Sequence, residues 1–283
     1  EAHGSHFKFS DKLPISALEA GADITVQSTH KTLPSFTQTS MIHVGTERVN
    51  IDKLKEMSSL YQSTSPSYLF LASLEIARAY MEGEGKARLE ETLKIITKTI
   101  KSLNEIERVH VFTGDEKDKT IYDMDITKIL FRLDGIIGTK LENILKEDYN
   151  IHLEMSDYYY ALILSSLMNE KEDFKKLIDS VEYISKNSTY EEIKPMNINM
   201  PTPKIDLPIY KAFYSNKKVM DLTESKDKIS ASFVIPYPPG VPLICPGERI
   251  TKEHIEFIRF LMDKGIEIIG LIGYNKEKIE LVD

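Results

Sequence analysis

The residues best suited to chemistry in this sequence lie in one short segment, Ser28-Thr29-His30-Lys31. A strand-like apolar stretch over residues 22–26 precedes it, and a segment with almost no charge follows it. A lysine among such neighbours needs a partner, because burying a lone ammonium group is costly. Lys31 could instead be held covalently as a Schiff base, while Ser28 and His30 bind a phosphate. Pyridoxal phosphate requires such an arrangement, and a chance string on a surface turn is the alternative.

The composition indicates a soluble globular protein and argues against several partners. The 283 residues are 41% hydrophobic and 28% charged, and no apolar stretch is long enough to span a membrane. The net charge of −8 argues against nucleic acid as a main partner. It is compatible with a small cationic substrate, although a solubilising acidic surface is the simpler explanation. The single cysteine, Cys245, excludes an intrachain disulfide and fits a reducing cytoplasm.

Apolar periodicity divides the chain into three predicted domains, at residues 1–82, 83–190 and 191–283. In the first, Ile24 and Val26 alternate with polar neighbours and predict a strand. Asn50 is placed to cap a helix that runs to about residue 61. Residues 68–81 are predicted as a largely buried helix that ends at Gly83 and Gly85.

The second predicted domain alternates helices and strands. Apolar residues three and four apart over 89–103 and 174–184 predict amphipathic helices, with a further helix over 136–145. Strands are predicted over 109–111, 129–133 and 151–155. Residues 158–167 could form a strand or a buried helix, and their aromatic residues favour a strand. This order is typical of a small α+β domain.

A polar, Pro-containing linker over residues 186–208 leads into the third predicted domain. We expect a strand over 229–235, a Pro-rich turn and a helix over 252–264. Thr251 is placed to cap that helix and Gly265 to end it. A final strand is predicted over 266–271.

Four further motifs occur in order along the chain, and together they are far more specific than any one of them. They are Glu1-Ala2-His3-Gly4-Ser5-His6, Thr64-Ser65-Pro66-Ser67-Tyr68, Asn150-Ile151-His152-Leu153-Glu154-Met155-Ser156-Asp157, and Pro236-Tyr237-Pro238-Pro239-Gly240-Val241-Pro242-Leu243 followed by Pro246-Gly247-Glu248. Five of the 12 prolines lie in the last motif, for which a polyproline ligand is the alternative. With Ser28-Thr29-His30-Lys31, the set resembles the bacterial ornithine/lysine/arginine decarboxylases, which are fold-type-I pyridoxal-phosphate enzymes.

The resemblance implies a fold and an activity. The fold would be α/β, with residues 1–82 as the C-terminal part of the large cofactor-binding domain, followed by a small α+β domain and a C-terminal decarboxylase-type domain. The activity would be pyridoxal-phosphate-dependent decarboxylation of arginine, lysine or ornithine to the amine and CO₂, in polyamine or diamine metabolism. A cytoplasmic homodimer or higher homo-oligomer with shared active sites is implied as well.

The resemblance also implies roles at matching positions. Lys31 would carry the cofactor, and Ser28 and His30 would bind its phosphate. Ala2 would pack against one face of the pyridine ring, with His3 beside it. His3 and His6 are spaced as a metal pair might be, but two histidines alone are a weak signal, and no metal is expected.

Three further pairs of residues are weaker candidates, and only the first takes its role from the resemblance. Thr64 or Ser65 would reach a cofactor phosphate, of the same or the neighbouring subunit. Glu154 and Asp157 follow a predicted strand and could face the cationic tail of a substrate, although helix capping or solvation explains them equally well. Asp123 and Asp125 could form an acid–base pair, but a turn before a strand is the favoured interpretation.

The sequence departs from the family pattern in one respect. The Asp that would precede Glu1 and pair with the pyridine nitrogen is absent, as are an upstream phosphate loop and the residue that covers the other ring face. We therefore expect this chain to be the C-terminal portion of a longer enzyme, with an incomplete site by itself. A split protein, an inactive relative, and an aminotransferase or lyase are the alternatives.

Overall fold

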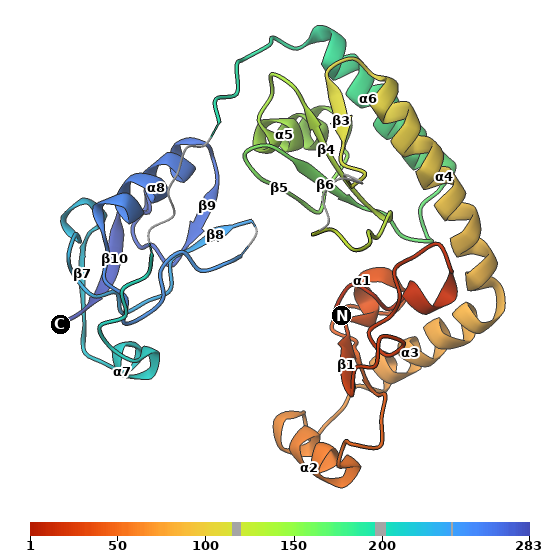
Figure 1. Cartoon of the computed structure of the whole chain (residues 1–283), viewed down its shortest axis with the longest axis horizontal. Helices are drawn as coiled ribbons and strands as arrows, with labels where there is room; N and C mark the ends of the chain where they lie inside the picture. Colours follow the sequence, from red (N-terminus) through yellow and green to blue (C-terminus); the bar gives the residue numbers. More distant parts are fainter. Residues whose placement is uncertain (115–119, 196–201, 239) are drawn as a thin grey trace. The chain divides into compact units, whose positions relative to one another are not determined.

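The computed structural model describes residues 1–114, 120–195, 202–238 and 240–283 (Figure 1). The chain divides into two compact units. The first unit comprises residues 1–107, 111–129 and 163–186, and the second comprises 108–110, 130–162 and 187–283. The predicted domain boundaries at residues 82/83 and 190/191 stay a prediction. Within the described residues, no helix has both the length and the apolarity needed to cross a membrane.

A two-stranded antiparallel sheet underlies the Lys31 segment in the first unit. Strand β1 (Ile24–Gln27) pairs with β2 (Met41–Val44), and α1 (Thr29–Thr32) forms a single turn directly after β1. The predicted strand is confirmed. Ile24 and Val26 are exposed and Thr25 is buried, so the strand turns its apolar side chains outwards.

Helix α2 (Ile51–Tyr61) confirms the predicted cap, since the Asn50 side chain accepts a hydrogen bond from the backbone N–H of Lys53 at 2.9 Å. Helix α3 (Tyr68–Tyr80) exists as predicted, but its predicted burial is wrong. Only Ser73 and Ala77 are buried, while most of its large apolar side chains are exposed. The apolar run therefore indicated a helix but not a buried one.

The prediction that Gly83 and Gly85 end this helix is also wrong. A π-helical turn, η2 (Met81–Gly85), leads without a break into α4 (Lys86–Glu105). Gly85 is buried, and a Cβ there would lie 2.6 Å from Met81 Sδ. A glycine inside a helix costs only about 1 kcal/mol relative to alanine, so tight packing at Gly85 overrides its tendency to end a helix.

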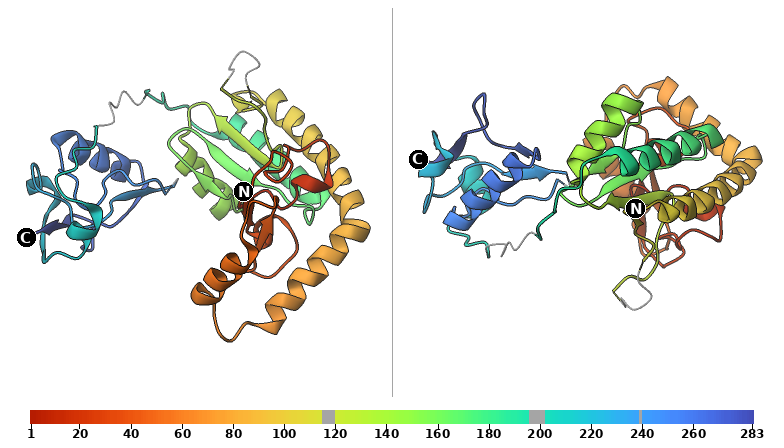
Figure 2. Two further views of the ribbon diagram at one scale, coloured as in Figure 1. Left: turned by 60° about the horizontal axis from the view of Figure 1, so that its bottom comes forward. Right: turned by 90° about the horizontal axis from the view of Figure 1, so that it is seen from above.

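Two long helices supply the apolar core of the first unit. Helix α4 buries Leu89, Leu93, Ile96 and Leu103, and α6 (Lys171–Asn187) buries Phe174, Leu177, Val181 and Ile184. Both amphipathic helices were predicted, and Figures 1 and 2 show them side by side. Arg88 of α4 donates to the carbonyl oxygens of Leu167 and Asn169, which lie just before α6. The short 3-10 helix η1 (Phe7–Phe9) belongs to the N-terminal segment.

A four-stranded sheet has the order β3 (Val109–Val111), β4 (Lys128–Leu133), β6 (Ala161–Leu164), β5 (Met155–Ser156). Helix α5 (Gly138–Tyr149) follows β4. The strand predicted over 151–155 is mostly wrong, because only Met155 and Ser156 pair. Ile151 instead donates its N–H to Leu145 O, so this stretch closes the C-terminus of α5.

The second unit ends in two small antiparallel sheets and a helix. Its elements are α7 (Ile209–Phe213), β7 (Lys217–Asp221), the 3-10 turn η3 (Leu222–Glu224), β8 (Ile235–Tyr237), α8 (Lys252–Asp263), β9 (Glu267–Ile269) and β10 (Lys278–Val282). Strand β7 pairs with β10, and β8 with β9. Their apolar core includes Tyr158, Leu222, Val234, Ile244, Ile250, Ile258, Ile268, Ile279 and Leu281.

Some of the features predicted for this region are confirmed and others are wrong. The cap of α8 is confirmed, because Thr251 accepts from His254 N and Gly265 follows the helix with φ +76. Instead of the predicted strand, Ile229, Ser230 and Val234 form isolated bridges, and β10 was not predicted. Pro239 of the proline motif and residues 196–201 of the predicted linker lie outside the described residues.

Candidate functional site

The α1 turn presents Lys31 to solvent at the end of β1. The side chain is exposed, contrary to the burial suggested by its neighbours. Its Nζ lies 2.8 Å from Nε2 of His3, a hydrogen-bonding distance. The Lys31 side chain therefore does not pay the cost of burial, because it is exposed and lies beside His3. Its amine is accessible to a reactant.

The N-terminal segment lies directly against this turn. Ser28 donates its N–H to Ala2 O at 3.1 Å, which brings Ala2 and His3 beside Ser28 and Lys31. The Glu1 carboxylate anchors the same segment by accepting from Gln27 Nε2 at 2.7 Å. The structure thus brings Ala2, His3, Ser28 and Lys31 close together, and their roles at one cofactor site stay a prediction.

His30 is oriented by a backbone carbonyl. Its Nδ1 lies 2.7 Å from Thr39 O, and since a carbonyl oxygen can only accept, Nδ1 must donate. In the neutral ring, Nε2 is then an acceptor, so His30 can donate to a phosphate through its ring only as the imidazolium. Ser28 at the N-cap of α1 makes no capping bond with its side chain, which leaves this hydroxyl a suitable donor to an anion.

A buried polar cluster lies beneath the N-terminal segment. His6 is 2% exposed, and its Nε2 is 3.2 Å from Oδ2 of Asp125. Lys128 Nζ forms an ion pair with the same carboxylate, and Thr127 donates to it through Oγ1 at 2.7 Å. Burial alone would raise the pKa of Asp125, but the hydrogen bond and charge of His6 and the hydrogen bonds from Lys128 and Thr127 outweigh it and hold this pKa well below its usual value.

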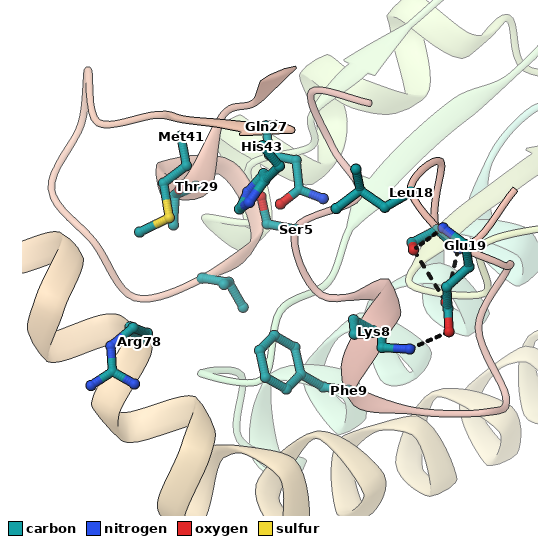
Figure 3. A pocket seen from close by; sticks show the side chains of 12 residues that line it. Ser5, Lys8, Phe9, Leu18, Glu19, Gln27, Thr29, Met41, His43 and Arg78 are labelled. Atoms are coloured by element: carbon teal, nitrogen blue, oxygen red, sulfur yellow. Dashed lines mark hydrogen bonds and ion pairs between the residues drawn. The ribbon is translucent and has the colours of Figure 1, made fainter. Parts of the chain in front are cut away.

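The first unit also contains a cavity of about 290 Å³ whose lining includes Thr29 but not Lys31 (Figure 3). Ser5, Thr29 and His43 lie on one side of it, and Lys8 with its bond to Glu19 on the other. Among the described residues, Ser5 Oγ, Thr29 Oγ1 and His43 Nε2 have no hydrogen-bond partner. This cavity lies next to the α1 turn, and its lining does not include Lys31.

The residues around Lys31 fit pyridoxal phosphate by their chemistry. Lys31 offers an exposed amine for the aldehyde, Ser28 offers a hydroxyl for the phosphate, and Ala2 offers a small apolar side chain that a flat ring can cover. His3 and His6 have partners other than a metal, in Lys31 and Asp125. Within the described parts of the chain, no three His, Cys, Asp or Glu side chains converge as metal ligands would.

Thr64 and Ser65 lie in the exposed loop between α2 and α3. Thr64 lines a second hollow of about 520 Å³, together with Ile42 and Ile51. The backbone N–H of Ser65 donates to Ser63 Oγ. None of these contacts involves the Lys31 turn, so their role at a cofactor phosphate stays a prediction.

Glu154 and Asp157 belong to the second unit, and both are exposed. The Asp157 carboxylate accepts from the backbone N–H groups of Tyr159 and Tyr160, each at 2.7 Å. This turn joins β5 to β6, so a local role accounts for Asp157. Substrate binding by either residue stays a prediction.

The contacts that the sequence did not reveal are those of the buried cluster. The turn at Asp125 is confirmed by the bond from Lys128 N to Asp125 O at 3.0 Å. Its pairing with His6 spans 119 residues. The only signal in the sequence was the presence of the polar residues Asp125, Thr127 and Lys128 at the start of an alternating strand. This pattern did not indicate that Asp125 pairs with His6.

Comparison with known proteins shows relatives along almost the whole chain. The chain is 36% identical over 277 residues to the arginine decarboxylases of Bacillus subtilis (strain 168) and Bacillus anthracis, covering 95% of this chain and 56% of each relative. It thus spans about half the length of these curated relatives. The crystal structure of Francisella novicida lysine decarboxylase LdcF matches with a TM-score of 0.76 at 23% identity, over 92% of this chain and 49% of that one.

This structural match confirms the predicted α/β fold class. Two family profiles also match the sequence. "Orn/Lys/Arg decarboxylase, major domain" covers residues 1–173, and "Orn/Lys/Arg decarboxylase, C-terminal domain" covers residues 199–270. The first alone spans more than half of the 283 residues. The chain therefore belongs to the Orn/Lys/Arg decarboxylase family.

Proposed function

We propose that the protein containing this chain decarboxylates a basic amino acid, with pyridoxal phosphate bound covalently at Lys31. The observation that carries the proposal is the exposed Lys31 amine with Ala2, His3 and Ser28 around it, in a member of the Orn/Lys/Arg decarboxylase family. Arginine decarboxylases among the relatives favour arginine, while lysine and ornithine remain within the proposed substrate class. The products would be the amine and CO₂, within polyamine or diamine metabolism.

Each residue around Lys31 has a proposed task. When bound, pyridoxal phosphate supplies the electron sink for cleavage of the bond to the carboxylate. Ser28 and His30 hold the phosphate, and Ala2 orients the ring by packing against one face. His3, 2.8 Å from Lys31 Nζ, is placed to exchange a proton with that amine. Lys31 thus combines covalent attachment with access to a proton carrier.

The substrate side and the assembly belong to the same proposal. Glu154 and Asp157 are candidates for the cationic tail of the substrate, because an unpaired buried cation would be expensive. We propose a homodimer or higher homo-oligomer in which Thr64 or Ser65 serves a neighbouring site. Support comes from their exposed loop, whose described contacts do not include Lys31. The proposed cytoplasmic location rests on the single cysteine.

The test is borohydride reduction of the complete enzyme with pyridoxal phosphate, followed by peptide mapping. The label is expected on Lys31, and Lys31→Ala should lose the label, the visible absorbance and turnover. Lys12→Ala is the control, since Lys12 is an exposed lysine paired with Glu90. A label elsewhere, or a fully active Lys31→Ala variant, would overturn the proposal.

Product analysis distinguishes the reaction class. Incubation with arginine, lysine and ornithine should release CO₂ and the matching amine from at least one of them. A keto acid would instead identify an aminotransferase.

A further inference from the structure

The buried cluster beneath the N-terminal segment connects directly to the residues that face Lys31. Lys128 Nζ forms an ion pair with Asp125 and also donates to the backbone oxygen of His3 at 3.3 Å. The side chain of that same His3 lies 2.8 Å from Lys31 Nζ. One continuous path of polar contacts therefore leads from Asp125 through Lys128 and His3 to Lys31.

A second connection fixes the same segment three residues further on. His6 meets Asp125 at 3.2 Å, and its Nε2 lies 3.3 Å from Thr127 Oγ1. The side chains of Asp125 and Lys128 are only 12% and 19% exposed. Pairs with so little solvent around them are screened less than exposed pairs and hold a more defined geometry. The segment is thus held both at His3 and at His6, from the start of β4.

Stability alone does not explain why Asp125 and Lys128 are largely buried. A buried ion pair is weak evidence for a stabilising role, since its desolvation cost can exceed its Coulombic gain. The first unit already has an apolar core in α4 and α6. The cluster holds the N-terminal segment, which has no strand of its own, in one position. This is the segment whose Ala2 and His3 meet the α1 turn.

We propose that Asp125 and Lys128 are positioning residues, which hold Ala2 and His3 in register with Lys31. Neither touches the reacting atoms. Each acts through the N-terminal segment: Asp125 by fixing His6 and Lys128, and Lys128 by fixing the His3 carbonyl. The inference rests on the proposed function, because it assigns a purpose to the placement of Ala2 and His3 at the cofactor.

The decisive variants remove one link at a time in the complete enzyme. Lys128→Met keeps the aliphatic stem but loses the ammonium, and Lys128→Arg restores a cation. Asp125→Asn keeps an acceptor for Thr127 but loses the charge. Lys12→Met is the matched control, because the Lys12 ammonium pairs with Glu90 on α4 and not with Asp125 or the His3 carbonyl. Measured are the dissociation constant for pyridoxal phosphate, kcat, KM and the melting temperature without cofactor.

We expect Lys128→Met and Asp125→Asn to lower kcat about 100-fold, as a misplacement of roughly 1 Å can do, with little change in KM. Cofactor affinity should fall about tenfold, the lower end of the cost of losing an orienting partner at metal sites. Lys128→Arg should recover most of both, and Lys12→Met should match the wild type. The double variant should lose less than the two single losses combined, because both act through one link.

Several outcomes would overturn the inference. It would be overturned if Lys128→Met had the kcat and cofactor affinity of the wild type. It would also be overturned if Lys12→Met lost as much as Lys128→Met, or if Lys128→Arg recovered neither quantity. Failure of both Lys128→Met and Asp125→Asn to fold would assign the cluster to folding alone. The proposed function fails separately, if the wild-type enzyme forms no borohydride-reducible link at Lys31.

Discussion

Two buried histidines, one in each unit, are accommodated in opposite ways. His6 is 2% exposed and meets the carboxylate of Asp125, with Lys128 on the same carboxylate. His254 is 0% exposed, and its Nδ1 accepts from Thr251 N at 3.1 Å. Its Nε2 has no hydrogen-bond partner among the described residues. An imidazole can therefore be buried beside charges that hold a segment in place, or as an acceptor within a helix cap.

The difference matches the surroundings of each ring. His6 belongs to a segment without strands, which needs specific polar contacts to keep one position. His254 sits at the start of α8 against an apolar core that includes Ile250 and Ile258. Hydrogen bonds and ion pairs fix the position of His6, whereas apolar packing fixes the position of His254. Three substitutions or conditions test this contrast.

The largest effect is expected from Asp125→Ala. Removing one partner of a buried pair leaves His6 and Lys128 without their carboxylate, which typically costs 3–5 kcal/mol. Because Asp125 keeps 12% exposure, we expect a loss of about 3 kcal/mol in the free energy of unfolding, measured by urea denaturation. Asp123→Ala is the control, since Asp123 is exposed, and should change stability by less than about 0.5 kcal/mol. Equal losses would refute a structural distinction between the two carboxylates.

A smaller effect is expected from Thr251→Ala in the second unit. The Thr251 hydroxyl accepts from His254 N at 3.3 Å, and loss of such a cap typically costs about 1 kcal/mol. Thr37→Ala, in an exposed loop of the first unit, should stay within about 0.5 kcal/mol. Urea midpoints of the two variants measure the difference. A neutral Thr251→Ala would mean that apolar packing alone positions His254.

The smallest effect is a pH dependence that originates at His254. Its pKa is lowered because burial disfavours the imidazolium, against the opposing charges of Glu248 and Glu253. A group with a lower pKa in the folded state binds fewer protons there. Its contribution is therefore complete above about pH 6.5 and is lost as the pH falls through the folded pKa.

His254→Asn should accordingly weaken the decline in stability between about pH 7 and pH 5. Melting temperatures of the wild type and the variant across this range measure it. Identical slopes would show that burial of this ring has no consequence for protonation. Asp125 has the same sign in a more acidic window, since its pKa is also lowered, and its contribution is lost only below about pH 3.8.

Local patterns in the sequence were predictive where the interactions are local. The caps at Asn50 and Thr251 are confirmed because the cap and the N–H it satisfies lie three residues apart. The amphipathic helices α4 and α6 are confirmed because their burial follows from a single period. The motif containing Lys31 likewise identified a family that the profile matches support.

Predictions failed where distant packing decides the outcome. Ile24 and Val26 alternate as a strand should, but their period cannot say which face is covered. Gly85 resembles a helix terminator until its contact with Met81 and Tyr80 is known. Ile151 alternates with its neighbours, yet its N–H bonds to Leu145 at the end of α5. In each case a tertiary contact overrides a local propensity.

For the candidate site, the sequence by itself determined which residues are proposed to carry the chemistry: Ala2, His3, Ser28, His30 and Lys31. Only the tertiary structure decided that Lys31 is exposed beside His3, and that His6 reaches Asp125 across 119 residues. The reason is physical. Residue types and short spacings fix the available functional groups and the local backbone, whereas pairing between distant groups depends on how the whole unit folds.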